Sequence, residues 1–257
     1  SEEERREFLD TANRETDRLT RLVNDVLDLS RLESSKRYHF DAVYIPQAVE
    51  QTLRTYQLNA RDKGIELIQD IDPNLPPVLG NYDLLLQVFA NLVGNALKFT
   101  QSGGKIAIRA YALDHDLGSH ILPSIVRVEV ADTGIGIDPE DQTAIFDRFF
   151  RVENRVHTLE GTGLGLSIVR NIIEKHQSAV YLVSEVSVGT TFWFDLAIFQ
   201  EKAVSPADAV SKASSSQSPG ANGSSANGAS NGVSSGANSG AIATPNSPAT
   251  AEIIATS

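Results

Sequence analysis

Residues 131–137, reading ADTGIGI, place one carboxylate ahead of two closely spaced glycines. A carboxylate accepts hydrogen bonds, so Asp132 could bind an exocyclic amine at the mouth of a pocket, while Gly134 and Gly136 would let the backbone approach a ligand closely. A tight turn that begins with Asp has the same pattern, and short motifs often match by chance. Taken alone, the stretch favours the turn over the binding site by roughly two to one.

A second set of polar side chains lies within the strongly apolar segment 83–99. Asn91, Asn95 and Lys98 follow one another at spacings of four and three, which would place them in a row along one stripe of a helix. Solvated asparagines are the alternative, but two of them amid so much apolar surface favour a polar cavity. In that arrangement the three groups could act on one ligand.

A third pattern, GTGLGL at residues 161–166, opens a helix that we expect to end near His176. Glycines that lead into a helix N-terminus leave backbone N–H groups free beside the positive end of the helix dipole, which suits a phosphate chain. A connection of roughly twenty residues separates this pattern from ADTGIGI, and a segment of that length behaves like a lid more often than like a plain connector.

The elements that must position these groups indicate an α/β domain. The expected helices and strands follow from apolar periodicity and from Pro46 and Gly64 as helix boundaries. Helices are expected at 46–63, 83–99 and 165–176, and strands at 65–71, 105–113, 125–131, 180–184 and 191–198. Asp138 and Pro139 would begin a short helix that runs through Phe146.

Two other segments are expected to be irregular. The run DPNLPPVLGN, residues 72–81, reads as a connector, and residues 114–123 read as a polar loop. That loop holds His115 and His120, but no third ligand accompanies them, so we assign them no function.

Residues 1–36 read as one long amphipathic helix that begins with a capping box formed by Ser1 and Glu4. Its apolar positions follow a heptad spacing that Glu15 interrupts: Phe8, Ala12, Leu19, Leu22, Val26 and Leu29. One such helix cannot bury its own stripe, so it needs a hairpin partner or a second copy of the chain. Packing against the domain that follows is the competing explanation.

Composition excludes several classes of function. The net charge of −11 argues against a nucleic-acid surface, and the absence of Cys rules out disulfides, thiolate metal sites and thiol nucleophiles. No apolar run is long enough to suggest a membrane span.

Residues 200–257 are rich in Ser, Ala, Gly and Asn, and we expect a disordered tail. A chain that starts at Ser1 and lacks Met is expected to be a processed protein or a fragment.

Four segments stand in a fixed order: NLVGNALKFT, ADTGIGI, FDRFF and GTGLGL. Together they resemble the N, G1, F and G2 boxes of sensor histidine kinases, whose ATP-binding domain shares a fold superfamily with the DNA gyrase, heat-shock chaperone and mismatch-repair ATPases. The match covers residues 40–196. Residues 1–36, ending in NDVLDLSRLES, are similar to the second helix of the family's dimerisation hairpin.

The resemblance implies a fold and a domain organisation. The expected fold is a two-layer α/β sandwich of a mixed β-sheet with helices on one face, preceded by the long amphipathic helix and followed by the disordered tail. Residues 1–36 would be the incomplete hairpin, 40–199 the ATP-binding catalytic domain and 200–257 the tail.

The resemblance also implies how the base of ATP would be bound. Asp132 would bind the adenine amino group, helped through a water molecule by Thr190. Gly134 and Gly136 would border the base, and Phe99 would lie near it.

For the phosphates, the resemblance implies that Asn95 holds Mg²⁺ and that Asn91 and Lys98 lie along the phosphate chain. Arg151 falls where the family often has a lid arginine that reaches the terminal phosphate. The residues that would wrap the phosphates are Gly161, Gly163, Leu164 and Gly165. Phe146, Phe149 and Phe150 would anchor the lid and touch the dimerisation helices.

The implied function is the catalytic part of a two-component sensor histidine kinase. It would bind Mg-ATP and transfer the γ-phosphoryl group to a histidine on a missing dimerisation helix, for relay to the receiver domain of a response regulator. In the hydrolysing relatives a glutamate stands at the position of Asn91 and activates water, which a neutral amide cannot do. A stand-alone ATPase is therefore less favoured, as the FDRFF box also indicates. The intact Asn95, Asp132 and GTGLGL disfavour the other alternative, a non-catalytic dimerisation module.

Some features depart from the family pattern. None of His39, His115, His120, His157 and His176 lies in the expected acceptor motif, so the fragment should not phosphorylate itself at the usual site. Gln177 and Ser178 replace a usual glycine pair and Ser187 replaces a glycine, so we expect altered loop geometry with binding intact. We expect a homodimer through the N-terminal helix and a cytoplasmic fragment without membrane contact; whether the parent protein is membrane-anchored is left open.

Overall fold

The computed structural model describes residues 1–34, 38–116, 121–151 and 161–200. Residues 152–160 of the predicted lid, His120, His157 and residues 201–257 of the predicted tail lie outside these residues. The described residues belong to one compact unit, Ser1–Lys202.

A mixed five-stranded sheet forms one layer of this unit, with the strand order β2-β4-β5-β7-β6. Its strands are β2 (Glu66–Ile71), β4 (Lys105–Asp116), β5 (Ile121–Asp132), β6 (Val180–Glu185) and β7 (Gly189–Ala197). β2 runs parallel to β4, and every other neighbouring pair is antiparallel. Alternate residues of β7, Phe192, Phe194 and Leu196, are buried, as expected for a sheet with one covered face.

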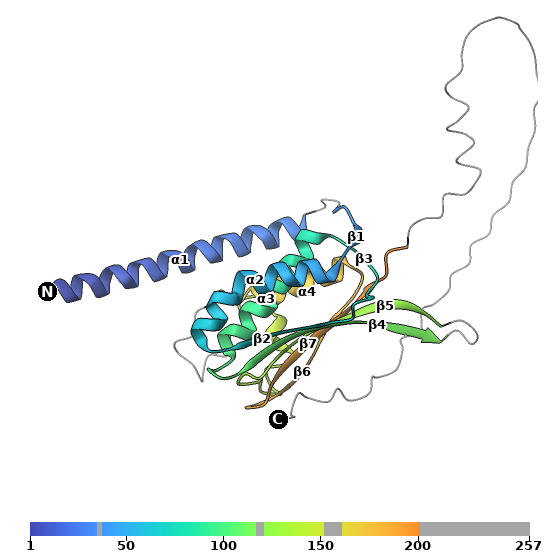
Figure 1. Cartoon of the computed structure of the whole chain (residues 1–257). Helices are drawn as coiled ribbons and strands as arrows, with labels where there is room; N and C mark the ends of the chain where they lie inside the picture. The colour runs from blue at the N-terminus through green and yellow to red at the C-terminus, as the bar shows by residue number, and fades with distance from the viewer. Residues whose placement is uncertain (35–37, 117–120, 152–160, 201–257) are drawn as a thin grey trace, which may run out of the picture. The chain divides into compact units, whose positions relative to one another are not determined.

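The second layer consists of α2 (Ile45–Lys63), α3 (Tyr82–Phe99) and α4 (Gly165–Lys175), which cover one face of the sheet (Figure 1). Gly64 ends α2 in the left-handed conformation, with φ 66°. The Asn81 side chain caps α3 by accepting a hydrogen bond from the Leu84 N–H. The α3 residues Leu85, Phe89, Leu92 and Val93 are almost fully buried, so this helix forms the centre of the core. The predicted two-layer α/β sandwich is confirmed.

Three expectations about local structure are wrong. The connector contains β3 (Val78–Gly80), which pairs antiparallel with β1 (Asp41–Val43) in a small second sheet. Strands β4 and β5 continue through most of the expected polar loop, so that His115 pairs with Leu122 across the hairpin. The short helix expected after Asp138 is only a single 3₁₀ turn at Ala144–Phe146, preceded by hydrogen-bonded turns.

The N-terminal helix α1 spans Glu2–Glu33, slightly shorter than expected, and the capping box of Ser1 and Glu4 is confirmed. Leu29 and Leu32 near its end are buried in the core of the domain. The side chains that remain exposed are Phe8, Leu9, Leu19, Val23, Val26 and Leu27. The stripe is therefore divided: its end packs on the domain, and the rest is exposed. No described helix is long and apolar enough to cross a membrane.

Candidate active site

Asp132, the last residue of β5, lies at the corner where β5 ends and β7 begins. Its Oδ1 atom accepts a hydrogen bond of 2.8 Å from the Gly134 N–H, and the Thr190 backbone N–H also contributes. Burial nevertheless dominates and raises the pKa of the Asp132 carboxyl to about 6. The group is thus a partly desolvated acceptor, which suits a carboxylate that binds an amine.

Hydrogen bonds from β6 and β7 fix the corner around Asp132. Thr190 is buried, and its hydroxyl lies 2.8 Å from the Ser184 hydroxyl. Ser184 donates to the Gly189 carbonyl at 3.0 Å and accepts from the Ile137 N–H at 2.8 Å. The segment after Asp132 is therefore attached to β6 and β7 before any ligand arrives.

The turn between β6 and β7 supports the same corner. The Ser187 N–H donates to the Ile135 carbonyl at 2.7 Å. Ser187 and Gln177, which stand where the family has glycines, have φ angles of 67° and 58°, the left-handed conformation that glycine favours. The expectation of an altered loop geometry at these positions stays a prediction. Gly136 also has a positive φ, and its Cα approaches the Glu185 backbone too closely for a side chain.

The polar row on α3 lies beside the glycine loop that precedes α4. A Cβ atom added to Gly165 would stand 2.9 Å from Asn91 Oδ1 and 4.0 Å from Asn95 Nδ2, and one added to Gly161 would stand 2.8 Å from Lys98 Nζ. Any side chain at these two positions would fill the space in front of the row. The structure thus brings together the two patterns that the sequence singled out separately.

Phe99 connects the α3 row to the Asp132 corner. Its carbonyl accepts a hydrogen bond of 3.3 Å from the Ile135 N–H, and Lys98 Nζ lies 4.6 Å from the centroid of its ring. The Asn91 amide donates to the Gln87 carbonyl at 3.0 Å, so its Oδ1 atom points toward the glycine loop. One end of the site thus presents a carboxylate, and the other presents two side-chain amides and an ammonium group.

Within the glycine loop, Thr162 organises the backbone. Its hydroxyl accepts a hydrogen bond of 3.3 Å from the Leu164 N–H, while the Leu164 side chain is fully buried. The Gly163 carbonyl accepts a hydrogen bond of 2.9 Å from the Phe149 N–H, which joins FDRFF to the loop. Arg151, two residues beyond Phe149, is exposed at the edge of the described segment.

The aromatic residues of FDRFF have different environments. Phe146 and Phe150 pack against the core, and Phe146 meets Phe192 edge-on with ring centroids 6.2 Å apart. Phe149 is 59% exposed. Arg148 of the same segment contacts α1 through an ion pair with Glu33.

The donor groups suit Mg²⁺ bound together with phosphates. Asn95 carries a side-chain amide, whose oxygen is a kind of ligand that Mg²⁺ accepts, and this amide lies near Gly165, with Nδ2 the atom nearest to it. Among the described residues, no group of three or more His, Cys, Asp or Glu side chains could hold a metal ion alone. Mg²⁺ usually takes few protein ligands and completes its shell with water and substrate phosphates, so these residues fit it.

Buried His176 has a structural role. Its Nε2 accepts from the Asn81 N–H at 3.1 Å, and its Nδ1 donates to the Ile172 carbonyl at 2.8 Å. Burial lowers the pKa of the imidazole, which stays neutral. Both ring nitrogens are therefore engaged, which agrees with the expectation that His176 is not the phosphoryl acceptor.

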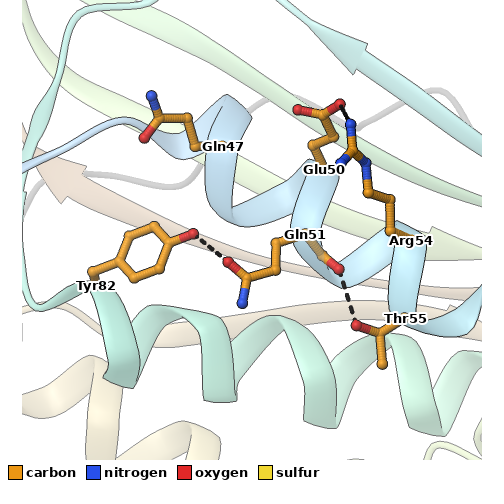
Figure 2. A pocket seen from close by; sticks show the side chains of 6 residues that line it. All are labelled: Gln47, Glu50, Gln51, Arg54, Thr55 and Tyr82. Carbon is orange, nitrogen blue, oxygen red and sulfur yellow. Dashed lines mark hydrogen bonds and ion pairs between the residues drawn. The ribbon is translucent and has the colours of Figure 1, made fainter.

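A polar pocket between α2 and the start of α3 lies apart from these groups (Figure 2). Its lining residues are Gln47, Glu50, Gln51, Arg54, Thr55 and Tyr82. Tyr82 donates to Gln51 at 2.7 Å, and Arg54 pairs with Glu50 at the same distance. None of the predicted site residues lines this pocket.

Sequence reasoning missed two residues of the site. Ser184 had a usable signal, because it is a polar residue on the inward side of β6, with Val180 and Leu182. Thr162 lies within GTGLGL, but only the glycines and Leu164 of that pattern were predicted to contact the phosphates. Its hydrogen bond to Asp25 depends on the position of α1, which the local sequence does not indicate.

Comparison with known proteins agrees with this architecture. Residues 80–199 match the family described as "Histidine kinase-, DNA gyrase B-, and HSP90-like ATPase", and residues 1–35 match the "His Kinase A (phospho-acceptor) domain". Drug sensory protein A of Synechocystis sp. is 70% identical over 201 residues, which are 78% of this chain and 30% of that protein. The chain thus spans less than a third of this relative.

Solved structures show the same arrangement. Full-length ShkA in complex with AMPPNP has a TM-score of 0.62 at 34% identity, covering 74% of this chain and 39% of ShkA. Histidine kinase ThkA in complex with the response regulator protein TrrA has a TM-score of 0.56 at 26% identity, covering 73% of this chain and 50% of that one. The two family matches, the sequence relatives and the shared fold establish that this chain belongs to the sensor histidine kinases.

Proposed function

We propose that this chain binds Mg-ATP and transfers the γ-phosphoryl group to a histidine on a dimerisation helix outside the chain. The observation that carries the proposal is the meeting of the α3 row with the glycine loop, beside the partly desolvated carboxylate of Asp132. A site with an amine acceptor at one end and amide and ammonium groups at the other matches the two ends of ATP. The AMPPNP complex of ShkA supports the same ligand.

In this proposal each side chain has a limited task. Asp132 accepts a hydrogen bond from the adenine amine, and Thr190 with Ser184 keeps that corner in place. Asn91 and Lys98 lie along the phosphates, and Asn95 is the metal ligand. Mg²⁺, when bound, would neutralise charge on the phosphate oxygens.

The transfer would break the bond between the γ-phosphorus and its bridging oxygen, form a phosphorus–nitrogen bond to the acceptor imidazole and release ADP. Lys98 and Arg151 would stabilise the charge that spreads over the phosphoryl oxygens. Asn91 cannot remove a proton from water, which disfavours the runner-up function, a stand-alone ATPase.

Two partners belong to the proposal. The exposed α1 side chains would pair with a second copy of the chain, since one helix cannot bury such a stripe alone. The complex of ThkA with TrrA supports a response regulator as the final phosphate acceptor. A cytoplasmic location for this part of the protein is an expectation of the same proposal.

The test is to mix this chain with a separate helical hairpin that carries the acceptor histidine and to follow ATP labelled in the γ-phosphate. A matched hairpin with glutamine in place of that histidine is the control. Acid-labile label on the first hairpin alone supports the histidine kinase. Release of free phosphate without any labelled hairpin supports the ATPase and contradicts the proposal.

A further inference from the structure

The last turns of α1 contact the ATP-binding domain along one stripe. Its members are the half-buried or buried residues Leu22, Asp25, Asp28, Leu29 and Leu32. Leu29 and Leu32 are the apolar part of the contact, at 7% and 2% exposure. Asp25 and Asp28 add two carboxylates to this face, and Asp28 also pairs with Arg31 at 3.6 Å. Acidic side chains are seldom buried unless they are paired.

Each carboxylate meets a residue of the proposed phosphate end. Asp25 Oδ2 accepts a hydrogen bond of 2.5 Å from the hydroxyl of Thr162, in the glycine loop. Asp28 Oδ2 accepts one of 2.8 Å from Gln87 Nε2, and the Gln87 carbonyl in turn holds the Asn91 amide. The two contacts thus connect α1 with both sides of the phosphate end, the glycine loop and α3.

The contact at Thr162 carries the stronger chemical signal. A carboxylate and a phosphate are both oxyanions that accept short hydrogen bonds from hydroxyl groups. The Thr162 hydroxyl already accepts from the Leu164 N–H, so its single proton goes to Asp25. An anionic ligand in the loop would compete with Asp25 for that proton.

The electrostatics oppose the simultaneous presence of Asp25 and a triphosphate. Burial is the largest cause of the raised pKa of Asp25, the negative charge of Asp28 adds to it, and Thr162 and Arg21 act in the opposite direction. A negative charge that is already poorly solvated would be destabilised further by phosphates bound to the neighbouring glycines. Docking of α1 and binding of the phosphate chain should therefore weaken each other.

Building on the function proposed above, we infer that Asp25 acts as an intramolecular phosphate mimic: it holds the Thr162 hydroxyl while α1 is docked, and the phosphates of ATP displace it. The device would couple nucleotide binding to release of the end of α1. Because the coupling is reciprocal, a signal that loosens α1 would also raise the affinity for ATP.

The decisive variant is Asp25→Asn, which keeps an oxygen that can accept from Thr162 but removes the charge. We expect calorimetry to show Mg-ATP binding about tenfold tighter than in the wild type, an advantage that shrinks at high salt. Affinity for adenosine, which has no phosphate, should be unchanged. Asp17→Asn is the matched control, because it removes the same charge from an exposed position of the same helix.

The second readout is the position of α1. The chain has no Cys, so cysteines introduced at the exposed positions Leu19 and Leu58 can be spin-labelled selectively. In the wild type, Mg-ATP should change the distribution of distances between the labels, and adenosine should not.

The outcomes separate this inference from the proposed function. If wild type and Asp25→Asn bind Mg-ATP with equal affinity, the phosphate mimic is wrong while the kinase site stands. If Asp25→Asn tightens adenosine as much as ATP, the effect is not on the phosphates and the inference also fails. If neither protein binds Mg-ATP, the proposed function fails and the inference falls with it.

Discussion

The two ends of the site are built in different ways. The corner around Asp132 is held by the ladder between β5 and β7 and by the hydroxyl groups of Ser184 and Thr190. The phosphate end is formed by a helix and a loop that belong to different parts of the sequence, and it also touches α1 through Thr162 and Gln87. The first end is fixed within the sheet, whereas the second depends on how neighbouring elements are placed.

This difference has a functional meaning. Under the proposed function, the corner around Asp132 would recognise the base in every state of the protein, because its hydrogen bonds do not involve α1. The phosphate end can respond to α1, so control of the reaction is best exerted there. Changes at the two ends should therefore separate base recognition from phosphate recognition.

The largest effect is expected for Asn95→Ala, which removes the proposed metal ligand from the phosphate end. We expect affinity for Mg-ATP to fall on the order of 1,000-fold, because a metal ion at phosphate oxygens contributes several kcal/mol. Calorimetry with Mg-ATP and with adenosine measures the two ends separately. Adenosine affinity and the melting temperature should not change, and a variant that still binds Mg-ATP like the wild type would show that the metal assignment is wrong.

At the base corner, Asp132→Asn should stabilise the protein in the absence of nucleotide. The carboxyl of Asp132 has an ordinary pKa of 3.8 that rises to about 6 in the folded state, so the folded protein binds the proton more tightly than the unfolded chain does. Wild-type stability should therefore fall as the pH rises from about 4 to about 6. A neutral amide escapes this penalty.

The gain of Asp132→Asn over the wild type should be near zero at pH 4 and reach at most about 3 kcal/mol above pH 7. Urea unfolding at several pH values measures it. Equal stability of the two proteins at all pH values would show that Asp132 is not destabilised by burial.

The same substitution should weaken binding of the base. An amide accepts a weaker hydrogen bond from the adenine amine than a carboxylate does, so ATP and adenosine should both lose about tenfold in affinity. Tripolyphosphate, which lacks the base, is the control ligand. Equal losses for ATP and tripolyphosphate would return ADTGIGI to the role of a turn.

The smallest effect is expected for Ser187→Gly, in the turn that supports the base corner. Ser187 has a φ of 67°, and glycine adopts that conformation without the steric cost of a Cβ atom. We expect a gain of about 1 kcal/mol in the free energy of unfolding. ATP affinity should be unchanged, and a loss of affinity would mean that the serine itself contributes to the site.

The sequence predicted those parts of the fold that local patterns determine. The apolar periodicity of α3, the proline and glycine at the ends of α2 and the glycines before α4 each have a local physical cause. The parts it missed depend on distant partners: Val78–Gly80 forms a strand only because Asp41–Val43 lies beside it. The alternatives for α1 could not be separated either, because burial of Leu29 and Leu32 depends on the folded domain.

The candidate site was predicted to a similar degree. The residue types and spacings of Asn91, Asn95, Lys98 and Asp132 identify them as candidate site residues from the sequence alone. Thr162 and Ser184 act on other residues through hydrogen bonds made in three dimensions, and Asp25 looked like one more charge on an amphipathic helix. No local pattern distinguishes Asp25, whose side chain contacts a loop 137 positions away in sequence, from the solvated acidic residues of the same helix.

The most direct test of the account is a crystal structure of this chain with Mg²⁺ and AMPPNP. We predict that the adenine amine lies within hydrogen-bonding distance of Asp132, that Mg²⁺ is bound to Asn95 and that the phosphates lie against Gly161 and Gly165. A nucleotide bound in the pocket of Figure 2, or with its base away from Asp132, would contradict the account.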